Sequence, residues 1–150
     1  MNWQNLLMLL LSLFSTTFTN DHLEGNLSLE IHNITKAEGQ IMVAVYNQKE
    51  KFLEDGQEVV IKSLPVEKTG SITVSFPNLP FGKEYSIAVY HDRNGNNSLD
   101  TNIMGIPSEP YGFSNNARSK WGPPKYEIAR FEMNQRQQNM VIQVKKWRKQ

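Results

Sequence analysis

Residues Ile72–Tyr90 read ITVSFPNLPFGKEYSIAVY and carry the clearest fold signal in the chain. Apolar Ile72, Val74 and Phe76 alternate with polar neighbours, which is the two-residue period of a strand with one buried face. Two prolines and a glycine then interrupt the pattern and predict a corner with an aromatic residue packed beneath it. The final segment, Tyr85–Tyr90, is apolar at five of six positions, as expected for a central strand covered on both faces.

The two-residue period recurs along most of the chain and predicts further strands. These strands are expected at Leu27–His32, Ile41–Val45, Glu58–Ser63, Tyr126–Met133 and Met140–Val144. A short helical turn is expected at Phe52–Gly56, and no segment shows a sustained helical stripe. About seven strands at this spacing predict an all-β, single-domain antiparallel β-sandwich of immunoglobulin-like or prealbumin-like type with one long loop.

The N-terminal segment predicts export. The first 20 residues carry no charge and contain the apolar run Leu6–Phe14, which is too short to span a bilayer but suits the apolar region of a signal peptide. An uncleaved N-terminal anchor is the alternative. We therefore expect a signal peptide at 1–20, a sandwich domain at 21–144, and a periplasmic, outer-membrane-associated or secreted location. The chain has no cysteine, so neither a lipoprotein attachment point nor a disulfide is available.

Positive charge gathers at the C-terminus, in a basic tail at 145–150. Four residues of this tail are basic, namely Lys145, Lys146, Arg148 and Lys149, and without them 12 basic residues face 15 acidic ones. Such a tail could contact nucleic acid or anionic lipid, although a solvated, frayed terminus is the simpler interpretation. Because the body of the chain is mildly acidic, we expect no nucleic-acid partner.

A loop of calcium-binding type follows the central strand. The segment His91–Asp100 reads HDRNGNNSLD and places oxygen-bearing side chains at alternate positions, namely Asp92, Asn94, Asn96, Ser98 and Asp100. Calcium takes about six to eight oxygen ligands, and a tight loop with ligands at alternate positions can supply several of them. Counted from Asp92, the segment matches an EF-hand loop at its first, third, fifth and ninth positions.

The loop departs from the EF-hand pattern in two places. Asn97 replaces the glycine of the sharp turn, although asparagine tolerates a positive φ better than most residues. Ile103 stands where a bidentate glutamate closes an EF-hand site, and Glu109, returned by a turn at Gly105–Pro107, is the candidate replacement. We therefore expect a weak calcium site formed by the side chains of Asp92, Asn94, Asn96, Asp100 and Glu109 and the backbone carbonyl of Ser98. The alternative is a network of Asx-turns without an ion.

The connection that contains this loop is unusually long, because 33 residues, 92–124, precede the strand expected at Tyr126. Loops longer than about 12–15 residues are uncommon and are mostly functional or disordered. Tyr111, Phe113 and Trp121 lie in this one, which argues against disorder. These aromatic residues form either an exposed platform for a sugar or peptide, or a lid over the open end of the sandwich. The lid is favoured because large exposed apolar patches are rare.

His91 and Asp92 suggest an envelope hydrolase as a further alternative. Three serines lie near them in the sequence, but none occupies the Gly-x-Ser-x-Gly turn of a serine hydrolase. The three histidines lack the spacing of a zinc-binding helix, and the chain has no cysteine nucleophile. The sequence therefore does not predict an enzyme.

Three segments together resemble a known family. They are His91–Asn102, the run Gly105–Asn116 (GIPSEPYGFSNN) and the corner Leu79–Gly82 (LPFG), and they are similar to the DUF2141 proteins, a bacterial family of unknown function. The resemblance covers roughly Leu27 to Lys146 and implies an exported β-sandwich with no assigned activity. From the residues we expect a non-catalytic module of the cell envelope whose long loop is ordered by weakly bound calcium. An envelope protein or glycan is the expected kind of partner.

Overall fold

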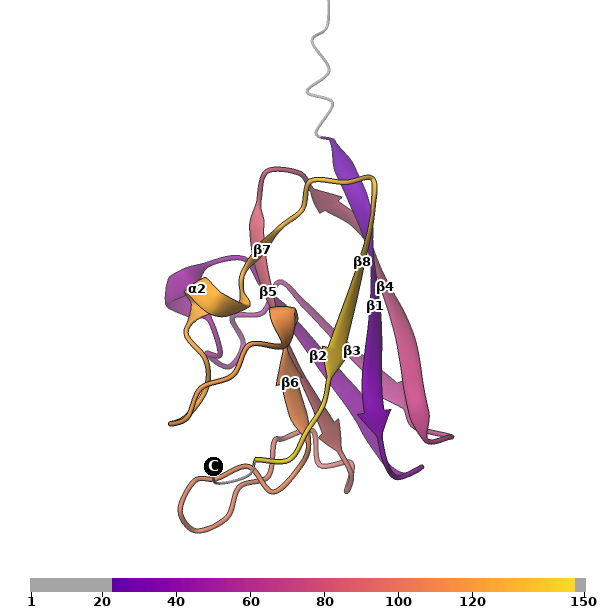
Figure 1. Ribbon diagram of the computed structural model, residues 1–150, viewed down its shortest axis with the longest axis vertical. Helices are drawn as coiled ribbons and strands as arrows, with labels where there is room; N and C mark the ends of the chain where they lie inside the picture. Colours follow the sequence, from indigo (N-terminus) through magenta and orange to yellow (C-terminus); the bar gives the residue numbers. More distant parts are fainter. Residues whose placement is uncertain (1–22, 148–150) are drawn as a thin grey trace, which may run out of the picture.

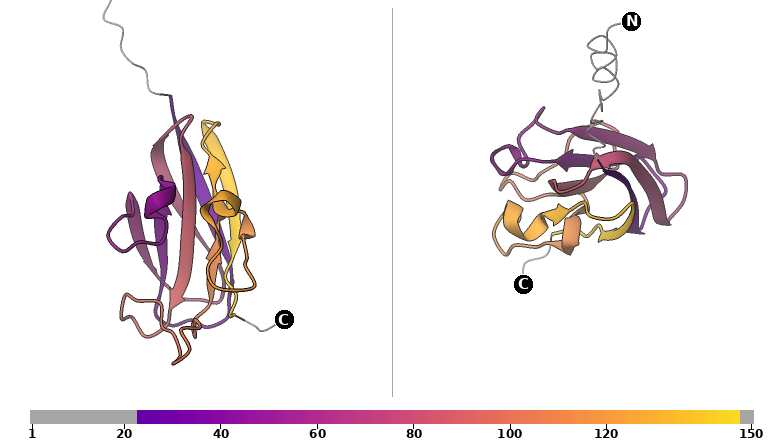
Figure 2. Two further views of the ribbon diagram at one scale, coloured as in Figure 1. Left: turned by 90° about the vertical axis from the view of Figure 1, so that its left-hand side faces the viewer. Right: turned by 90° about the horizontal axis from the view of Figure 1, so that it is seen from above.

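The computed structural model describes residues 23–147. This part of the chain forms two β-sheets that pack face to face (Figures 1 and 2), which confirms the predicted all-β sandwich. The predicted signal peptide at 1–20 and two basic residues of the tail, Arg148 and Lys149, lie outside the described residues. No helix within 23–147 is long and apolar enough to cross a membrane.

The smaller sheet has three strands and the larger has five. In spatial order, the smaller sheet contains β4 (Gly70–Pro80), β1 (Glu24–Ile34) and β8 (Gln137–Gln143). The larger sheet contains β3 (Val60–Pro65), β2 (Gln40–Tyr46), β5 (Glu84–Asp92) and β6 (Tyr111–Phe113), and β7 (Phe131–Glu132) also pairs with β5. Every strand pair is antiparallel except β1 with β8, which run parallel.

Alternate residues of the strands fill the space between the sheets. Eight aliphatic side chains from four strands are completely buried there: Leu27, Leu29, Ile31, Ile41, Val43, Val45, Ile87 and Ile142. Because successive side chains of a strand point to opposite faces, each strand contributes every second residue to this core. The apolar alternation read from the sequence is therefore the inner face of the sandwich.

The corner between β4 and β5 has the predicted aromatic support. Tyr85 is buried beneath it, and its hydroxyl donates a hydrogen bond to the carbonyl of Pro80 over 3.4 Å. Its ring lies 6.1 Å from that of Phe131 in β7. The corner therefore anchors the start of β5, the strand that ends at Asp92.

Two sequence predictions about local structure were wrong. A strand was expected at Tyr126–Met133, but the structure has the short helix α2 (Tyr126–Ala129) followed by β7. Tyr126 and Ala129 are both buried while Ile128 between them is exposed, which is the spacing of a helical turn rather than a strand. The helical turn expected at Phe52–Gly56 lies slightly earlier, as the 3₁₀ turn η2 (Lys49–Lys51).

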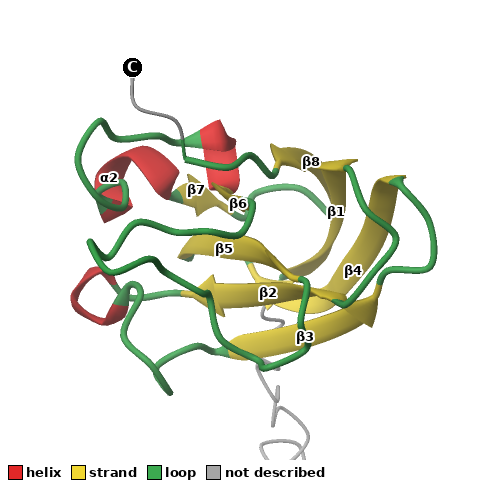
Figure 3. Ribbon diagram, turned by 90° about the horizontal axis from the view of Figure 1, so that it is seen from below, coloured by secondary structure: helices red, strands yellow, loops and turns green. Residues whose placement is uncertain are grey.

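The long connection also contains secondary structure that the sequence did not predict. It forms β6 and the 3₁₀ turn η3 (Ser114–Asn116), which follow each other directly. The turn η2 and the helix α2 lie on the side of the larger sheet that points away from the smaller sheet (Figure 3), and η3 contacts both α2 and β8. A second apolar cluster lies beneath them, built on the buried Tyr111, Phe113, Ala117 and Ala129. The strand β5 is thus covered on its outer face as well as its inner face, as predicted.

Candidate functional site

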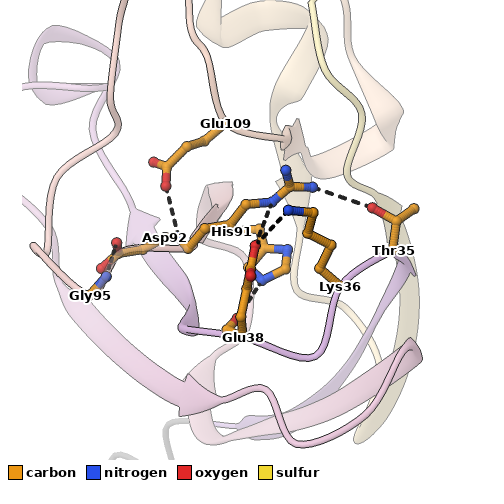
Figure 4. Close-up of polar contacts among 8 residues, drawn as sticks. Thr35, Lys36, Glu38, His91, Asp92, Gly95 and Glu109 are labelled. Atoms are coloured by element: carbon orange, nitrogen blue, oxygen red, sulfur yellow. Dashed lines mark hydrogen bonds and ion pairs between the residues drawn. The ribbon is translucent and has the colours of Figure 1, made fainter.

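The candidate calcium loop, called the Asp92 loop and comprising Asp92–Asp100, begins at the last residue of β5. Antiparallel pairing places Asp92 directly opposite Gln40, the first residue of β2. The Gln40 amide nitrogen donates a hydrogen bond of 2.8 Å to Asp92 Oδ2. The start of the loop is therefore fixed to the rigid end of the larger sheet, and Figure 4 shows this region.

The Asp92 carboxylate organises the loop through backbone hydrogen bonds. Its Oδ1 accepts from the N–H groups of Gly95 and Asn96, at 2.8 and 3.2 Å. Its Oδ2 accepts from the N–H of Asn97 at 2.9 Å, besides the amide of Gln40. The side chain is completely buried, so these four donors replace its water shell.

The ionised form of Asp92 is favoured by these hydrogen bonds. Burial on its own raises the pKa of the carboxyl group, because it removes water from the charge. The hydrogen bonds from Gln40 and from the loop N–H groups lower the pKa by more than burial raises it. The pKa of Asp92 therefore lies below its ordinary value, and the buried carboxylate is charged at neutral pH.

Two residues of the loop adopt left-handed backbone conformations that bring its N–H groups onto Asp92. Gly95 has φ 73° and Asn97 has φ 64°. Glycine and asparagine are the residues that enter this region most readily. Asn97 thus performs the turn that glycine performs in an EF-hand loop, as the sequence predicted.

Glu109 returns to the Asp92 loop, as expected from the turn before it. Its Oε1 accepts a hydrogen bond of 2.7 Å from the N–H of Arg93, and its Oε2 accepts one of 3.1 Å from the N–H of Asp100. The side chain is only 5% exposed. One carboxylate therefore joins the beginning and the end of the loop. Figure 4 shows Glu109 beside the beginning of the loop.

The segment between the loop and Glu109 is a small hairpin closed by Asn102. The Asn102 side-chain oxygen accepts hydrogen bonds from the N–H groups of Met104 and Ile106, at 2.9 and 3.1 Å. Thr101 and Pro107 face each other across the hairpin. We call residues 101–107 the loop tip, and its apolar side chains Ile103 and Met104 are strongly exposed.

The exposed side of the loop brings three candidate ligands together. The amide nitrogens of Asn94 and Asn96 lie 2.7 and 2.9 Å from the two carboxylate oxygens of Asp100. The side-chain oxygens of the same asparagines accept hydrogen bonds from the N–H groups of Asn96 and Ser98. These are Asx-turns, the arrangement that the sequence left open as the ion-free alternative.

The candidate ligands differ in how well they fit a cation. Asp92 accepts four hydrogen bonds, which occupy about as many lone-pair sites as a carboxylate has, so it fits the role of loop organiser better than that of ligand. Asp100 retains unused acceptor capacity, and each neighbouring amide would present its oxygen to a cation after a half-turn of its end group. No group of three or more His, Asp or Glu side chains within 23–147 has an arrangement that could hold a metal ion.

His91 and Asp92 do not form an exposed catalytic pair. The His91 side chain is completely buried, and its Nε2 lies 2.8 Å from the carbonyl of Glu38. Its Nδ1 has no hydrogen-bond partner among the described residues. Ser108 and Ser114 donate their side-chain hydrogen bonds to the backbone carbonyls of Asp100 and Ala129 rather than to the histidine.

Three polar residues near the loop were not singled out in the sequence. Arg93 places its guanidinium 3.3 Å from the hydroxyl of Thr35 and 3.9 Å from the carboxylate of Glu38, which also pairs with Lys36 (Figure 4). The three residues are therefore Arg93, Glu38 and Gln40, whose contact with Asp92 is described above. Gln40 and Glu38 carry no local motif, because strand register brings Gln40 to the loop from a distant part of the chain and Glu38 lies just before it.

The three aromatic residues proposed as a platform are separated by the structure. Tyr111 and Phe113 are 9% and 6% exposed and belong to the cluster on the outer face of the larger sheet. Their rings lie 5.9 Å apart in an edge-to-face arrangement. Trp121, by contrast, is 84% exposed. Tyr111 and Phe113 are therefore buried, but on the outer face of the larger sheet rather than over the open end of the sandwich, and of the three only Trp121 presents its ring to solvent.

Comparison with known proteins identifies the family. A family model described as an uncharacterized protein conserved in bacteria, DUF2141, matches residues 29–141. The chain belongs to the DUF2141 family. The match spans both sheets and the Asp92 loop, in agreement with the resemblance noted in the sequence. No curated protein and no solved structure matches this DUF2141 chain.

Proposed function

We propose that this DUF2141 protein is an exported, non-catalytic module of the cell envelope whose Asp92 loop is stabilised by weakly bound calcium. The role of such a module is binding or structural, with an envelope protein or glycan as its partner. The observation that carries the proposal is the convergence of Asn94, Asn96 and Asp100 on the exposed side of a loop whose backbone is already fixed. Oxygen-rich clusters of this kind suit a hard divalent cation.

The hydrogen bonds of the loop support weak rather than tight binding. For Asn94 and Asn96 to bind calcium through their oxygens at the position their nitrogens occupy, both must give up their Asx-turn hydrogen bonds. Each such bond contributes about 0.5–1.5 kcal/mol. Calcium must offset this loss, so an affinity of about 10⁻⁴–10⁻³ M, typical of extracellular modules, is expected.

Burial supports a non-catalytic role. A substrate must contact the groups that act on it, yet the side chains of His91 and Asp92 are both completely buried. The Asp92 carboxylate accepts hydrogen bonds from loop N–H groups rather than from the His91 imidazole. The hydrolase alternative rests on His91 and Asp92, and neither side chain is accessible to a substrate.

Export is supported by the sequence. The uncharged N-terminal segment with the run Leu6–Phe14 has the composition of a signal peptide. Calcium-binding modules outside the cell typically have dissociation constants of about 10⁻⁴–10⁻³ M, so a weak site suits an exported protein. The absence of cysteine leaves the apolar core and the loop interactions to hold the domain together.

Thermal unfolding with and without calcium tests the proposal. A ligand that binds only the folded protein stabilises it by RT ln(1 + [L]/Kd), so a site of ~0.1 mM in ~10 mM calcium adds about 2.7 kcal/mol. For a domain of this size, the melting temperature should rise by about 5–10 °C. Asp100→Asn should lose most of this increase, whereas Asp55→Asn, an exposed control outside the loop, should retain it.

Either of two results would contradict the calcium site. Equal melting temperatures in calcium and in chelator would leave the loop as an ion-free Asx-turn network. An equal calcium response in Asp100→Asn and in the control would place the bound cation elsewhere. In both cases the fold and the buried role of Asp92 would be unaffected, because neither depends on the cation.

A further inference from the structure

Two surface grooves meet at the end of the molecule that carries the Asp92 loop. The first, called the basic groove, has a volume of about 1390 Å³, and the second, called the apolar groove, has a volume of about 1100 Å³. Four residues line both grooves and form a shared wall: Tyr111, Lys120, Trp121 and Trp147. A single molecule of sufficient length can therefore contact both grooves at once.

The basic groove is a concentration of positive charge in a nearly neutral chain. Arg93, Arg118, Lys120, Lys145 and Lys146 line it, and no aspartate or glutamate does. The formal net charge of the whole chain is only +1. Among the described residues, no carboxylate pairs with the ammonium groups of the three lysines. These charges are free to bind an anion.

The two arginines of the basic groove are held in place by the protein. The Arg118 guanidinium donates hydrogen bonds to the carbonyls of Tyr111 and Gln143 and lies 5.2 Å from the centre of the Tyr111 ring. Arg93 is held by Thr35 and Glu38. An anion in this groove therefore meets two arginines held by the protein and three exposed lysines.

The apolar groove runs over the outer face of the larger sheet. Met42, Ala88 and Tyr90 form part of its floor and are half-buried. Met104 of the loop tip and Trp121 of the shared wall line it as well, with exposures of 74% and 84%. The groove has about the size of the clefts in which proteins bind small molecules, about 300–1,000 Å³.

The acidic residues of the apolar groove lie at the end away from the basic groove. They are Asp55 and Glu58, and Glu58 accepts a hydrogen bond from the hydroxyl of Tyr46. Tyr46 is the last residue of β2 and pairs with Ser86, whereas Gln40, at the other end of β2, pairs with Asp92 beside the basic groove. The combined surface is therefore positive at one end, apolar along its length and negative at the other end.

We propose that the two grooves together bind one single-chain anionic amphiphile. Its anionic head lies among Lys120, Lys145 and Lys146, and its apolar chain lies along Met42, Ala88 and Met104 toward the Tyr46 end. The negative charges of Asp55 and Glu58 disfavour the reverse orientation. The three head-group lysines lie outside the Asp92 loop, whereas Asn97, Ser98 and Leu99 of that loop line the apolar groove.

Titration with dodecanoate tests the proposal, because two of the three tryptophans of the chain, Trp121 and Trp147, lie in the shared wall. We expect a saturable blue shift of tryptophan emission at concentrations below the critical micelle concentration. Decanoate should bind more weakly, by up to about fourfold for each methylene removed. Acetate should give no shift, and dodecyltrimethylammonium, with the same chain and opposite charge, should bind at least about tenfold more weakly.

Matched lysine variants locate the head group. Lys120→Gln/Lys145→Gln/Lys146→Gln should weaken dodecanoate binding by about tenfold, as expected for three exposed charge contacts. The control Lys68→Gln/Lys83→Gln/Lys125→Gln removes the same charge from exposed positions outside both grooves and should leave the affinity unchanged. Met104→Ser, at the exposed loop tip, should weaken binding several-fold without reducing stability.

Four results would overturn the proposal. Equal affinities for dodecanoate and dodecyltrimethylammonium would show nonspecific apolar binding, and equal affinities of the two lysine variants would place the head group elsewhere. Binding to vesicles of phosphatidylglycerol without binding to monomeric dodecanoate would show that this face docks on a membrane surface. A dimer in sedimentation analysis that dissociates in Met104→Ser and does not bind dodecanoate would show that a second copy of the chain covers the groove.

Discussion

The long connection between β5 and β7 has two halves that are ordered by opposite means. In residues 93–110, backbone N–H groups donate to two buried carboxylates: three to Asp92, at the end of β5, and two to Glu109. In residues 111–129, buried apolar side chains pack on the outer face of the larger sheet, with Phe113 and Ala129 among them. One half is therefore a polar network and the other is an extension of the core.

The difference implies that the two halves respond to different perturbations. The polar half buries little apolar area, since Ile103 and Met104 at its tip are strongly exposed, and its order depends on hydrogen bonds to the carboxylates of Asp92 and Glu109. The apolar half should respond to lost volume and little to pH. Substitutions that remove side-chain volume from the apolar half, or charge from the polar half, should therefore change stability in different ways.

The largest effect is expected for Phe113→Ala in the apolar half. The Phe113 ring is buried and contacts the rings of Phe52 and Tyr111 edge to face, at centroid distances of 6.1 and 5.9 Å. Truncation of a buried phenylalanine usually costs about 3–5 kcal/mol. Urea unfolding should show a lower midpoint, with a loss of this size in the free energy of unfolding.

Trp121→Ala is the matched control for that experiment. It removes an even larger aromatic side chain from the same connection, but the residue is 84% exposed. A change within about 0.5 kcal/mol is expected, as for most surface substitutions. If the two variants lose equal stability, the apolar half is not an extension of the core and the comparison fails.

The next largest effect is expected for Asp92→Asn in the polar half. Asparagine presents one amide nitrogen where a carboxylate oxygen now accepts, so two of the four donors lose their acceptor. Hydrogen bonds to charged groups contribute about 1.5–3 kcal/mol each. Because Gly95, Asn96 and Asn97 lie at exposed positions, water replaces part of two lost bonds, and we expect a loss of about 2–4 kcal/mol. Urea unfolding at neutral pH measures it, and an unchanged midpoint would contradict the central role of Asp92.

Lowering the pH should destabilise the polar half specifically, through protonation of Asp92. Because the pKa of Asp92 is lowered in the folded protein, the unfolded chain binds more protons as pH falls below about 5. The stabilisation by Asp92 is therefore complete above the ordinary pKa of about 3.9 and is lost as pH falls through the lower folded-state pKa. The urea midpoint of Phe113→Ala should fall with acid as steeply as the natural protein's, and that of Asp92→Asn less steeply.

The strands could be predicted from sequence where local alternation was sufficient. The inner-face residues of β1, β2, β4, β5 and β8 follow the two-residue period, and the core confirms them. The short strand β6 was missed because it forms by pairing with β5 and by packing against β8, both distant in sequence. A Cβ atom at Gly112 would lie 2.7 Å from Ile142 of β8. At Tyr126–Ala129 the segment is so short that its apolar residues fit the period of a strand as well as that of a helical turn, so the pattern could not decide between them.

The candidate site divides along the same line between local and distant interactions. The turn at Asn97 and the return of Glu109 were predicted, because both depend on residues close in the chain. The contact of Gln40 with Asp92 was not, because it joins residues 52 apart through strand register. The sequence placed an oxygen at Asp92 but gave no indication that its acceptor sites would be filled by N–H groups.

Glu109→Gln should produce the smallest and most local effect. Glutamine keeps one acceptor oxygen, so one of the two bridged N–H groups, from Arg93 or Asp100, loses its partner. We expect a loss of about 1–2 kcal/mol. Amide hydrogen exchange should accelerate at Arg93 and Asp100 and stay unchanged in the core strand β2, since local opening of a loop needs no global unfolding.

Glu132→Gln provides the control for this last prediction, because it changes the same functional group at an exposed position in β7. It should leave exchange at Arg93 and Asp100 unaltered. Faster exchange spread evenly over β2 and the Asp92 loop in Glu109→Gln would show that the loop opens only when the whole domain unfolds. In that case the polar half would be as much a part of the cooperative core as the apolar half, and the contrast between them would be one of chemistry alone.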